Sequence, residues 1–259
     1  QMKQDDYVKI NETAKWMQSI DKTAAAKEEA LRNSRNGIEG DFGDRRQKFL
    51  EELQGYQAMI DKFKTARDKR GVDDHIERID TLKEKFEQAR ITSEDIVKKE
   101  ELLGWEPTEF EILDVLEEAL DPYDKLWNLV SDFNKNHHAW YKGPLFHLVP
   151  DKVENECRDM VRLAFKLAGQ FESENLPDPA SVANVVKQGL DAFKVNVPLV
   201  LAFCNPGLKA RHWEEISGKI GFTIQPDNSF TLSRLVDMEV GKFLDDLSDI
   251  SDSATKEYG

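Results

Sequence analysis

The chain has little of what several protein classes require. It holds only two cysteines in 259 residues, Cys157 and Cys204, and no Cys-x-x-Cys motif. A disulfide-dependent secreted scaffold is therefore excluded, and we expect two buried, reduced thiols. No apolar run approaches the roughly 20 residues that span a bilayer, and residues 1–20 lack the apolar segment of a signal peptide. Neither a membrane-spanning protein nor a membrane partner is expected.

Basic side chains are also scarce relative to acidic ones. The chain carries 36 Lys and Arg against 50 Asp and Glu, a net charge of −14. Such a charge disfavours nucleic acid and anionic lipid as partners, because both are themselves negative. A third of the residues are charged, which predicts long helices with solvated faces around a modest core.

Motifs that carry chemistry are missing as well. A phosphate-binding loop needs two spaced glycines followed by Lys and a hydroxyl, but residues 217–220 and 241–243 lack the leading Gly and the hydroxyl. The glycines of 37–43 do not have dinucleotide-binding spacing, and no two histidines have metal-ligand spacing. We therefore expect no catalytic residue, cofactor or metal in this chain.

The first third of the chain follows a helical period. We expect a first helix that ends at the glycine-containing stretch 36–41, and a third that starts after Arg70-Gly71. Between them, aromatic residues recur every seven positions, at Phe42, Phe49, Tyr56 and Phe63. None of these helices can bury its apolar stripe alone, so residues 1–103 are predicted to form an antiparallel three-helix bundle, similar in design to a spectrin repeat.

Aromatic density rises and heptads end at 104–107, which predicts a second domain over 104–259. Its expected helices are one capped by Thr108, one starting at Asp121-Pro122, and others over 151–171, 180–193, 213–220, 231–238 and 243–254. Residues 145–150 are expected to be extended and 222–224 a brief strand, while 195–203 fits a strand or a buried helix. The predicted fold class is mainly α, an elongated multi-helix rod with at most short β segments.

One stretch of this second domain stands out. The apolar run 198–203 ends at Asn205-Pro206-Gly207, which predicts a forced turn, and a helix then opens with Arg211-His212-Trp213. We expect His212 to make a polar contact that fixes the turn. Arg211 is expected to find a carboxylate or carbonyl partner inside the domain. Large aromatics at helical spacing, Trp213 among them, are expected in the core.

The motif Asn205-Pro206-x-Leu208-x-x-Arg211-His212-Trp213 resembles the N-terminal part of the linker of dynein heavy chains. Further motifs follow the order found in that family. They are Tyr123-x-x-Leu126-Trp127, Trp140-x-x-Gly143-Pro144-Leu145, Gly221-Phe222 and Ile250-x-x-x-Ala254-x-Lys256-Glu257. The resemblance covers about 104–259, and residues 204–207 with 254–258 are more similar to axonemal inner-arm members. The first hundred residues match in helical character only.

The resemblance implies a mechanical element that catalyses nothing itself. In dynein heavy chains the linker arches over a ring of ATPase modules, so ATP and Mg²⁺ would belong to a ring downstream of Gly259. It implies as partners that ring, the dynein tail with light or intermediate chains, and, through the parent chain only, microtubules. The implied location is cytoplasmic and cytoskeletal, in a ciliary or flagellar axoneme.

The implied structural motif comprises Asn205, Pro206, Leu208, Arg211, His212, Trp213, Trp127, Trp140 and Pro144. An alternative rests on the heptads and the acidity alone: a passive, spectrin-like helical scaffold or protein-binding module. It predicts further bundle repeats in the parent chain and no ATPase modules.

Overall fold

Helices account for nearly all regular structure in the chain. A computed structural model describes residues 4–67, 71–227 and 229–258, and these residues contain α and 3-10 helices but no strand. The mainly α prediction is confirmed. The brief strand predicted at 222–224 is wrong, because this segment runs as a loop between two helices. Each helix within the described residues is too short or too polar to cross a bilayer.

The chain divides into two compact units. The first contains the residues up to Tyr56 together with Gln88–Leu113, and the second contains Gln57–Glu87 together with the residues from Asp114 onward. The sequence boundary expected between 103 and 104 remains a prediction about which segments fold independently.

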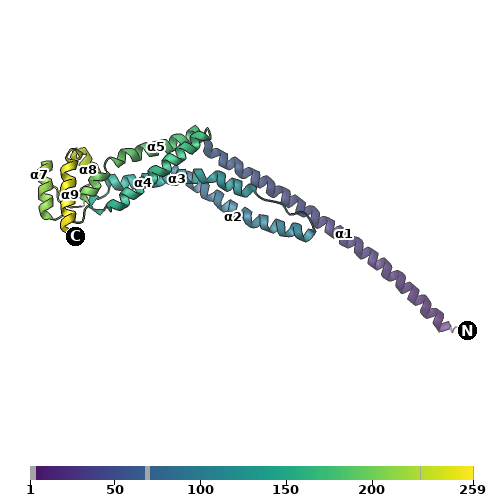
Figure 1. The fold of residues 1–259 in the computed structure, drawn as a ribbon. Coiled ribbons are helices and arrows are strands. Elements are labelled where there is room, and N and C mark those ends of the chain that lie inside the picture. The colour runs from purple at the N-terminus through teal and green to yellow at the C-terminus, as the bar shows by residue number, and fades with distance from the viewer. Residues whose placement is uncertain (1–3, 68–70, 228, 259) are drawn as a thin grey trace. The chain divides into compact units, whose positions relative to one another are not determined.

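Two long helices, α1 (Gln4–Asp61) and α2 (Val72–Leu103), replace the three helices expected in residues 1–103. The break expected at 36–41 is absent, and α1 appears as one uninterrupted ribbon (Figure 1). A glycine inside a helix costs only about 1 kcal/mol relative to alanine, which flanking helical turns can absorb. The three-helix arrangement predicted for this region is therefore wrong.

In the first unit, the aromatic heptad of α1 is buried as predicted. Phe42 packs against Trp105 with ring centroids 5.4 Å apart, and Phe49 packs edge-on against Phe110 at 5.5 Å. The aromatic seam of α1 is therefore covered by the segment that follows α2.

Polar contacts give the relative direction of α1 and α2 in this unit. Arg35 Nη2 lies 3.5 Å from the Leu103 carbonyl oxygen, and Arg46 Nε lies 2.9 Å from the Glu100 carboxylate. Residue numbers thus rise along α1 while those of their partners fall along α2. The two helices are antiparallel here, as expected.

Thr108 does not cap a helix, so that prediction is wrong. Its backbone N–H and its hydroxyl both donate to the buried carboxylate of Glu100, at 2.7 and 2.6 Å. The next helix, α3 (Ile112–Lys142), begins four residues later and runs through Pro122. The helix start predicted at Asp121-Pro122 is therefore wrong. Pro122 is buried in the second unit, where packing offsets the lost backbone hydrogen bond.

The second unit begins with the end of α1, the 3-10 helix η1 (Lys62–Thr65) and the first half of α2. Phe63 stacks on Tyr123 of α3 at 5.7 Å, and His75 of α2 stacks on Trp127 at 3.9 Å. Lys83 pairs with Asp124 at 2.7 Å. The heptad aromatic Phe63 thus belongs to the core of the second unit.

A helical hairpin follows. After the 3-10 turn η2 (Leu145–His147), which replaces the expected extended connection, α4 (Pro150–Ser173) and α5 (Pro177–Lys194) pack side by side (Figure 1). Both helices were expected, and α5 begins earlier than predicted because Pro177 occupies its first turn, where proline is favoured.

The last five helical segments are short. They are α6 (Val197–Phe203), α7 (Ala210–Ile220), α8 (Leu232–Asp237), η3 (Val240–Phe243) and α9 (Leu244–Tyr258). Helix α6 resolves the alternative left open for 195–203 in favour of a buried helix. Thr231 caps α8 by accepting from the Arg234 backbone N–H, as predicted, and Gly221 ends α7 with a φ of 83°.

Candidate functional site

Asn205 ties the turn between α6 and α7 to helix α9. Its amide nitrogen lies 2.9 Å from the Ser251 carbonyl oxygen, 2.8 Å from Ser251 Oγ and 2.7 Å from Thr255 Oγ1. Two amide hydrogens are thus shared among three acceptors. The Asn205 side-chain oxygen accepts from the Gly207 N–H at 2.8 Å, a local bond typical of asparagine turns. One side chain therefore shapes the turn and holds it against α9.

Gly207 lies where the backbone of the turn approaches that of α9 closely. A Cβ atom at this position would lie 2.8 Å from the Ala254 carbonyl oxygen and 3.1 Å from its carbonyl carbon. Because backbone atoms cannot move aside as a side chain can, only glycine fits here. The neighbouring Pro206 is exposed, and Leu208 is half-buried with its N–H on the Asn205 carbonyl at 3.2 Å.

His212 closes the first turn of α7. Its Nδ1 accepts from the Lys209 backbone N–H at 3.0 Å, while the His212 N–H donates to the Lys209 carbonyl at 2.9 Å. The ring is buried. Because Nδ1 accepts, a neutral ring carries its proton on Nε2, which lies 3.5 Å from the Glu257 carboxylate. A histidine thus does what glutamate or glutamine does in a capping box.

Arg211 and Glu257 form an ion pair between the start of α7 and the last turn of α9. The guanidinium also lies beside the His212 ring, with Nε 3.3 Å from Nε2. Since we place the proton on Nε2, this last approach is a close contact rather than a hydrogen bond. Arg211 therefore has a carboxylate partner within the second unit.

Trp213 is half-buried, not a core residue as expected. It lies on the apolar side of these contacts among the α6–α7 turn, α7 and α9, which are called the α6–α7–α9 cluster below. It lies edge-on to Phe146 of η2 at 5.4 Å and stacks on Phe203 of α6 at 6.3 Å. Pro144 precedes η2, whose Leu145 accepts through its carbonyl oxygen from Cys204 Sγ at 3.1 Å. The region around Pro144 is thereby joined to the end of α6.

Trp127 and Trp140 lie elsewhere on α3 and outside this cluster. Trp127 is fully buried against His75, and Trp140 stacks on Phe193 of α5 at 4.5 Å. Both are core residues, as large aromatics at helical spacing predict. The structure thus brings together six of the motif residues, with Pro144 adjoining them, and leaves these two apart.

Several contributors to the cluster could not be identified from the sequence. Gly207 was expected only as part of the turn and not as its close contact with α9, and the acceptors Ser251 and Thr255 carry no signal beyond sharing one helical face at a spacing of four. Only the fold shows that α9 returns to the turn.

The cluster contains structural contacts and no arrangement suited to catalysis. Throughout 4–67, 71–227 and 229–258, no three His, Cys, Asp or Glu residues gather as a metal site would require. Both cysteines are free, with Cys157 buried and Cys204 half-buried. Burial raises the pKa of the Cys204 thiol to about 12 and also raises that of Cys157, so neither forms a thiolate nucleophile at neutral pH.

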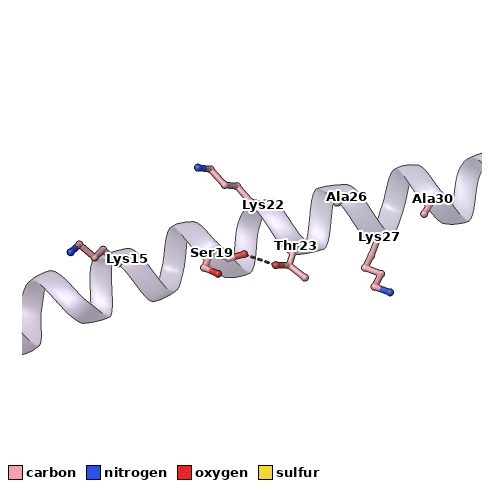
Figure 2. A pocket seen from close by; sticks show the side chains of 7 residues that line it. All are labelled: Lys15, Ser19, Lys22, Thr23, Ala26, Lys27 and Ala30. Carbon is pink, nitrogen blue, oxygen red and sulfur yellow. Dashed lines mark hydrogen bonds between the residues drawn. The ribbon is translucent and has the colours of Figure 1, made fainter.

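One hollow follows a single face of α1, and Figure 2 shows that all seven of its side chains come from that helix, with Thr23 donating to the Ser19 carbonyl at 2.8 Å. A single helix encloses no cavity. The segment 217–220 lies in α7, where Ser217 bonds to the Trp213 carbonyl and Lys219 pairs with Asp246 at 2.7 Å.

Comparison with known proteins gives a consistent result. The family model for the dynein heavy chain, N-terminal region 2, matches residues 113–259. Mouse dynein axonemal heavy chain 3 is 30% identical over 243 residues, which cover 93% of this chain and 6% of the mouse protein. The human protein of the same name is 31% identical over 230 residues, covering 88% and 6% of the two chains.

A third relative is more distant. Human dynein axonemal heavy chain 12 is 23% identical over 250 residues, which cover 94% of this chain and 8% of the relative. The chain thus spans less than a tenth of the length of these relatives. On the family match and the identity to the first two relatives, the chain belongs to the dynein heavy chain family and corresponds to part of its N-terminal region.

Proposed function

We propose that this chain is a segment of the mechanical linker of an axonemal dynein heavy chain of the inner-arm type. It transmits a movement that ATP hydrolysis drives in a ring elsewhere in the parent chain. The observation that carries the proposal is the family match over 113–259, which covers the whole of the α6–α7–α9 cluster. The fragment itself is proposed to bind no nucleotide and to hydrolyse none.

The contacts of the cluster suit an element that passes on force. The Asn205 amide, the Arg211–Glu257 ion pair and the close Gly207 approach each connect the α6–α7 turn with α9. Each of these contacts is directional or steric, so the two segments cannot slide past each other without breaking them. A movement applied to one segment would therefore reach the other.

The N-terminal part of α1 suits a connection to more helices of the parent chain. Five large apolar side chains among those that the structure describes there are more than half exposed: Trp16, Met17, Ile20, Leu31 and Ile38. Met17, Leu31 and Ile38 share one face at multiples of seven residues, the spacing at which helices pack together. We propose that this surface joins the tail of the parent chain, where light or intermediate chains associate.

Two measurements test the proposal in sequence. Reading the parent transcript beyond the codon for Gly259 comes first, and several Gly-x-x-x-x-Gly-Lys-Ser/Thr motifs in the same frame are expected. A stop codon, or further heptad repeats without such motifs, would instead support the passive spectrin-like scaffold.

The second measurement compares ATPase rate with microtubule gliding speed in the full-length parent motor. Asn205→Ala is expected to slow gliding while microtubule-stimulated ATP hydrolysis continues, because the linker would yield instead of transmitting the stroke. Asn128→Ala, which removes an exposed amide bonded only within its own helix, is the control and should change neither rate. Equal gliding speeds in the two variants would count against a mechanical role for the cluster.

A further inference from the structure

A groove between α4 and α6 has an apolar floor. The uncharged residues that line it, here called the floor, are Cys157 and Val161 of α4 together with Val197, Pro198 and Leu201 of α6. Cys157 and Val197 are buried, whereas Leu201 is 38% exposed. Burial raises the pKa of the Cys157 thiol, so the thiol stays neutral and the floor offers no charge. The groove is suited to apolar side chains from outside the second unit.

The charged residues that line the groove, here called the rim, are mostly cations. Arg158 and Arg162 follow one another by a helical turn on α4, and Lys194 stands at the end of α5. Glu154 is the one acidic residue among those that line the described groove. In a chain of net charge −14, this is a local reversal of sign.

The rim cations are only weakly engaged by neighbouring carboxylates. Arg158 contacts the neutral Asn155 side chain. Arg162 lies 3.8 Å from Asp159, but both side chains are more than two-thirds exposed, and such pairs contribute little. Lys194 lines the groove and is exposed. The positive charge of the rim is therefore available to a ligand.

The adjacent surface has the opposite character. Pro198 and Leu201 also line a second groove, where the charged residues are Asp151 and Asp252. The exposed face of α6 thus separates a cationic groove from an acidic one. A ligand that follows the cationic groove must carry its negative charge on the α4 side of its apolar face.

We propose that the α4–α6 groove binds an acidic, apolar-faced protein segment, in which leucine- or isoleucine-like side chains enter the floor and flanking carboxylates pair with Arg158, Arg162 and Lys194. Arginine favours such a partner because its planar guanidinium donates to two carboxylate oxygens at once. This inference does not rest on the linker role, since the groove and its charge are properties of the second unit alone.

Three synthetic peptides test the proposal against the 259-residue chain. They share one amphipathic 18-residue design with the same leucine stripe, and their flanking positions carry only glutamate, glutamine or lysine. Fluorescence anisotropy at physiological salt is expected to show the glutamate peptide binding at least tenfold more tightly than the glutamine peptide. Its affinity should fall as salt rises, because exposed charges are screened.

Variants locate the binding. Arg158→Glu with Lys194→Glu should weaken the glutamate peptide at least tenfold and should improve the lysine peptide. Leu201→Ala should weaken all peptides that bind, since it removes apolar floor. The matched control, Lys98→Glu with Lys135→Glu, makes the same change in net charge at exposed positions outside the groove and should leave binding unchanged.

The proposal is overturned by any of three results. The first is equal binding of the glutamate and glutamine peptides. The second is equal loss of binding in the groove and control variants, which would reveal a response to net charge alone. The third is concentration-dependent dimerisation in sedimentation runs that Arg158→Glu abolishes, because the occupant would then be a second copy of the chain. Circular dichroism on every variant separates loss of binding from loss of fold.

Discussion

Gly207 shows how one residue without a side chain permits a close contact between a turn and a helix. Replacing it by alanine would place a Cβ atom 2.8 Å from the Ala254 carbonyl oxygen. We expect Gly207→Ala to lower the free energy of unfolding by about 1–3 kcal/mol, the usual cost of forcing extra volume into a packed site. Urea denaturation of the 259-residue chain measures the change.

Gly218 provides the matched control for that substitution. It lies inside α7, and an added Cβ would meet nothing within 4 Å. Gly218→Ala should therefore raise the free energy of unfolding by about 0.5–1 kcal/mol, because alanine is the better helix former. The changes in the free energy of unfolding at the two positions are therefore expected to have opposite signs. If both substitutions lowered the free energy of unfolding, the effect at Gly207 would be unrelated to its contact with α9.

His137 gives the second unit a pH dependence. Its ring lies between Phe133, at 5.2 Å, and Tyr141, at 4.6 Å. Burial, assisted by the neighbouring His138, lowers the His137 pKa below its usual 6.5. The folded state therefore prefers the neutral ring. The resulting stability is present above pH 6.5 and is lost as the pH falls through the lower, folded-state pKa.

We expect an NMR titration to place the His137 pKa below 6.5, and His137→Phe to reduce the loss of stability between pH 7 and pH 5. His147→Gln, at an exposed position, serves as the control and should retain the full loss. A His137 pKa at or above 6.5 would contradict the proposed effect of burial.

At the scale of elements, α1 is the helix whose continuity matters most. Gly37 and Gly40 lie within it, and an added Cβ would meet nothing within 4 Å at either position. If the helix is continuous, Gly37→Ala with Gly40→Ala should strengthen it locally by about 0.5–1 kcal/mol for each residue.

Hydrogen exchange of the backbone amides around 30–44 measures this effect directly. Slower exchange in the double alanine variant is the expected outcome. Unchanged or faster exchange would indicate a turn at 36–41, as the glycines alone suggest. Gly104→Ala is a control with the opposite expected effect. The φ of 74° at Gly104 is unfavourable for alanine, so this variant should be less stable.

At the scale of the whole molecule, the question is which segment folds alone. The sequence places a boundary at 103/104, but Phe63 and His75 cover Tyr123 and Trp127 in the second unit. We therefore expect a fragment of residues 57–259 to unfold at a higher urea concentration than one of residues 104–259, because the shorter piece exposes both aromatic side chains.

Circular dichroism and tryptophan fluorescence of the two fragments provide the comparison. A shift of Trp127 emission towards that of a solvated indole is expected only in the shorter fragment. Equal stability and equal emission would support the boundary that the composition predicts.

Local patterns determined much of this protein. The heptad of Phe42, Phe49, Tyr56 and Phe63 predicted a buried seam, and that seam is present, because a seven-residue repeat places side chains on one helical face whatever the partner is. The Thr231 cap and the Gly221 helix end were equally local and equally predictable. The motif at 205–213 also indicated the family, because its residue types and spacing can be read without knowing their contacts.

Tertiary packing decided the rest. Gly37 was expected to end a helix and Pro122 to start one, yet both lie inside a helix, since flanking turns or a surrounding core offset a penalty of about 1 kcal/mol for glycine and about 3 kcal/mol for proline. Local propensity gives the free-energy cost of a glycine or proline inside a helix. It does not give the stabilisation that tertiary packing supplies in return. In the same way, only the return of α9 gave Asn205 and Arg211 their partners, because residues separated by about fifty positions share no local signal.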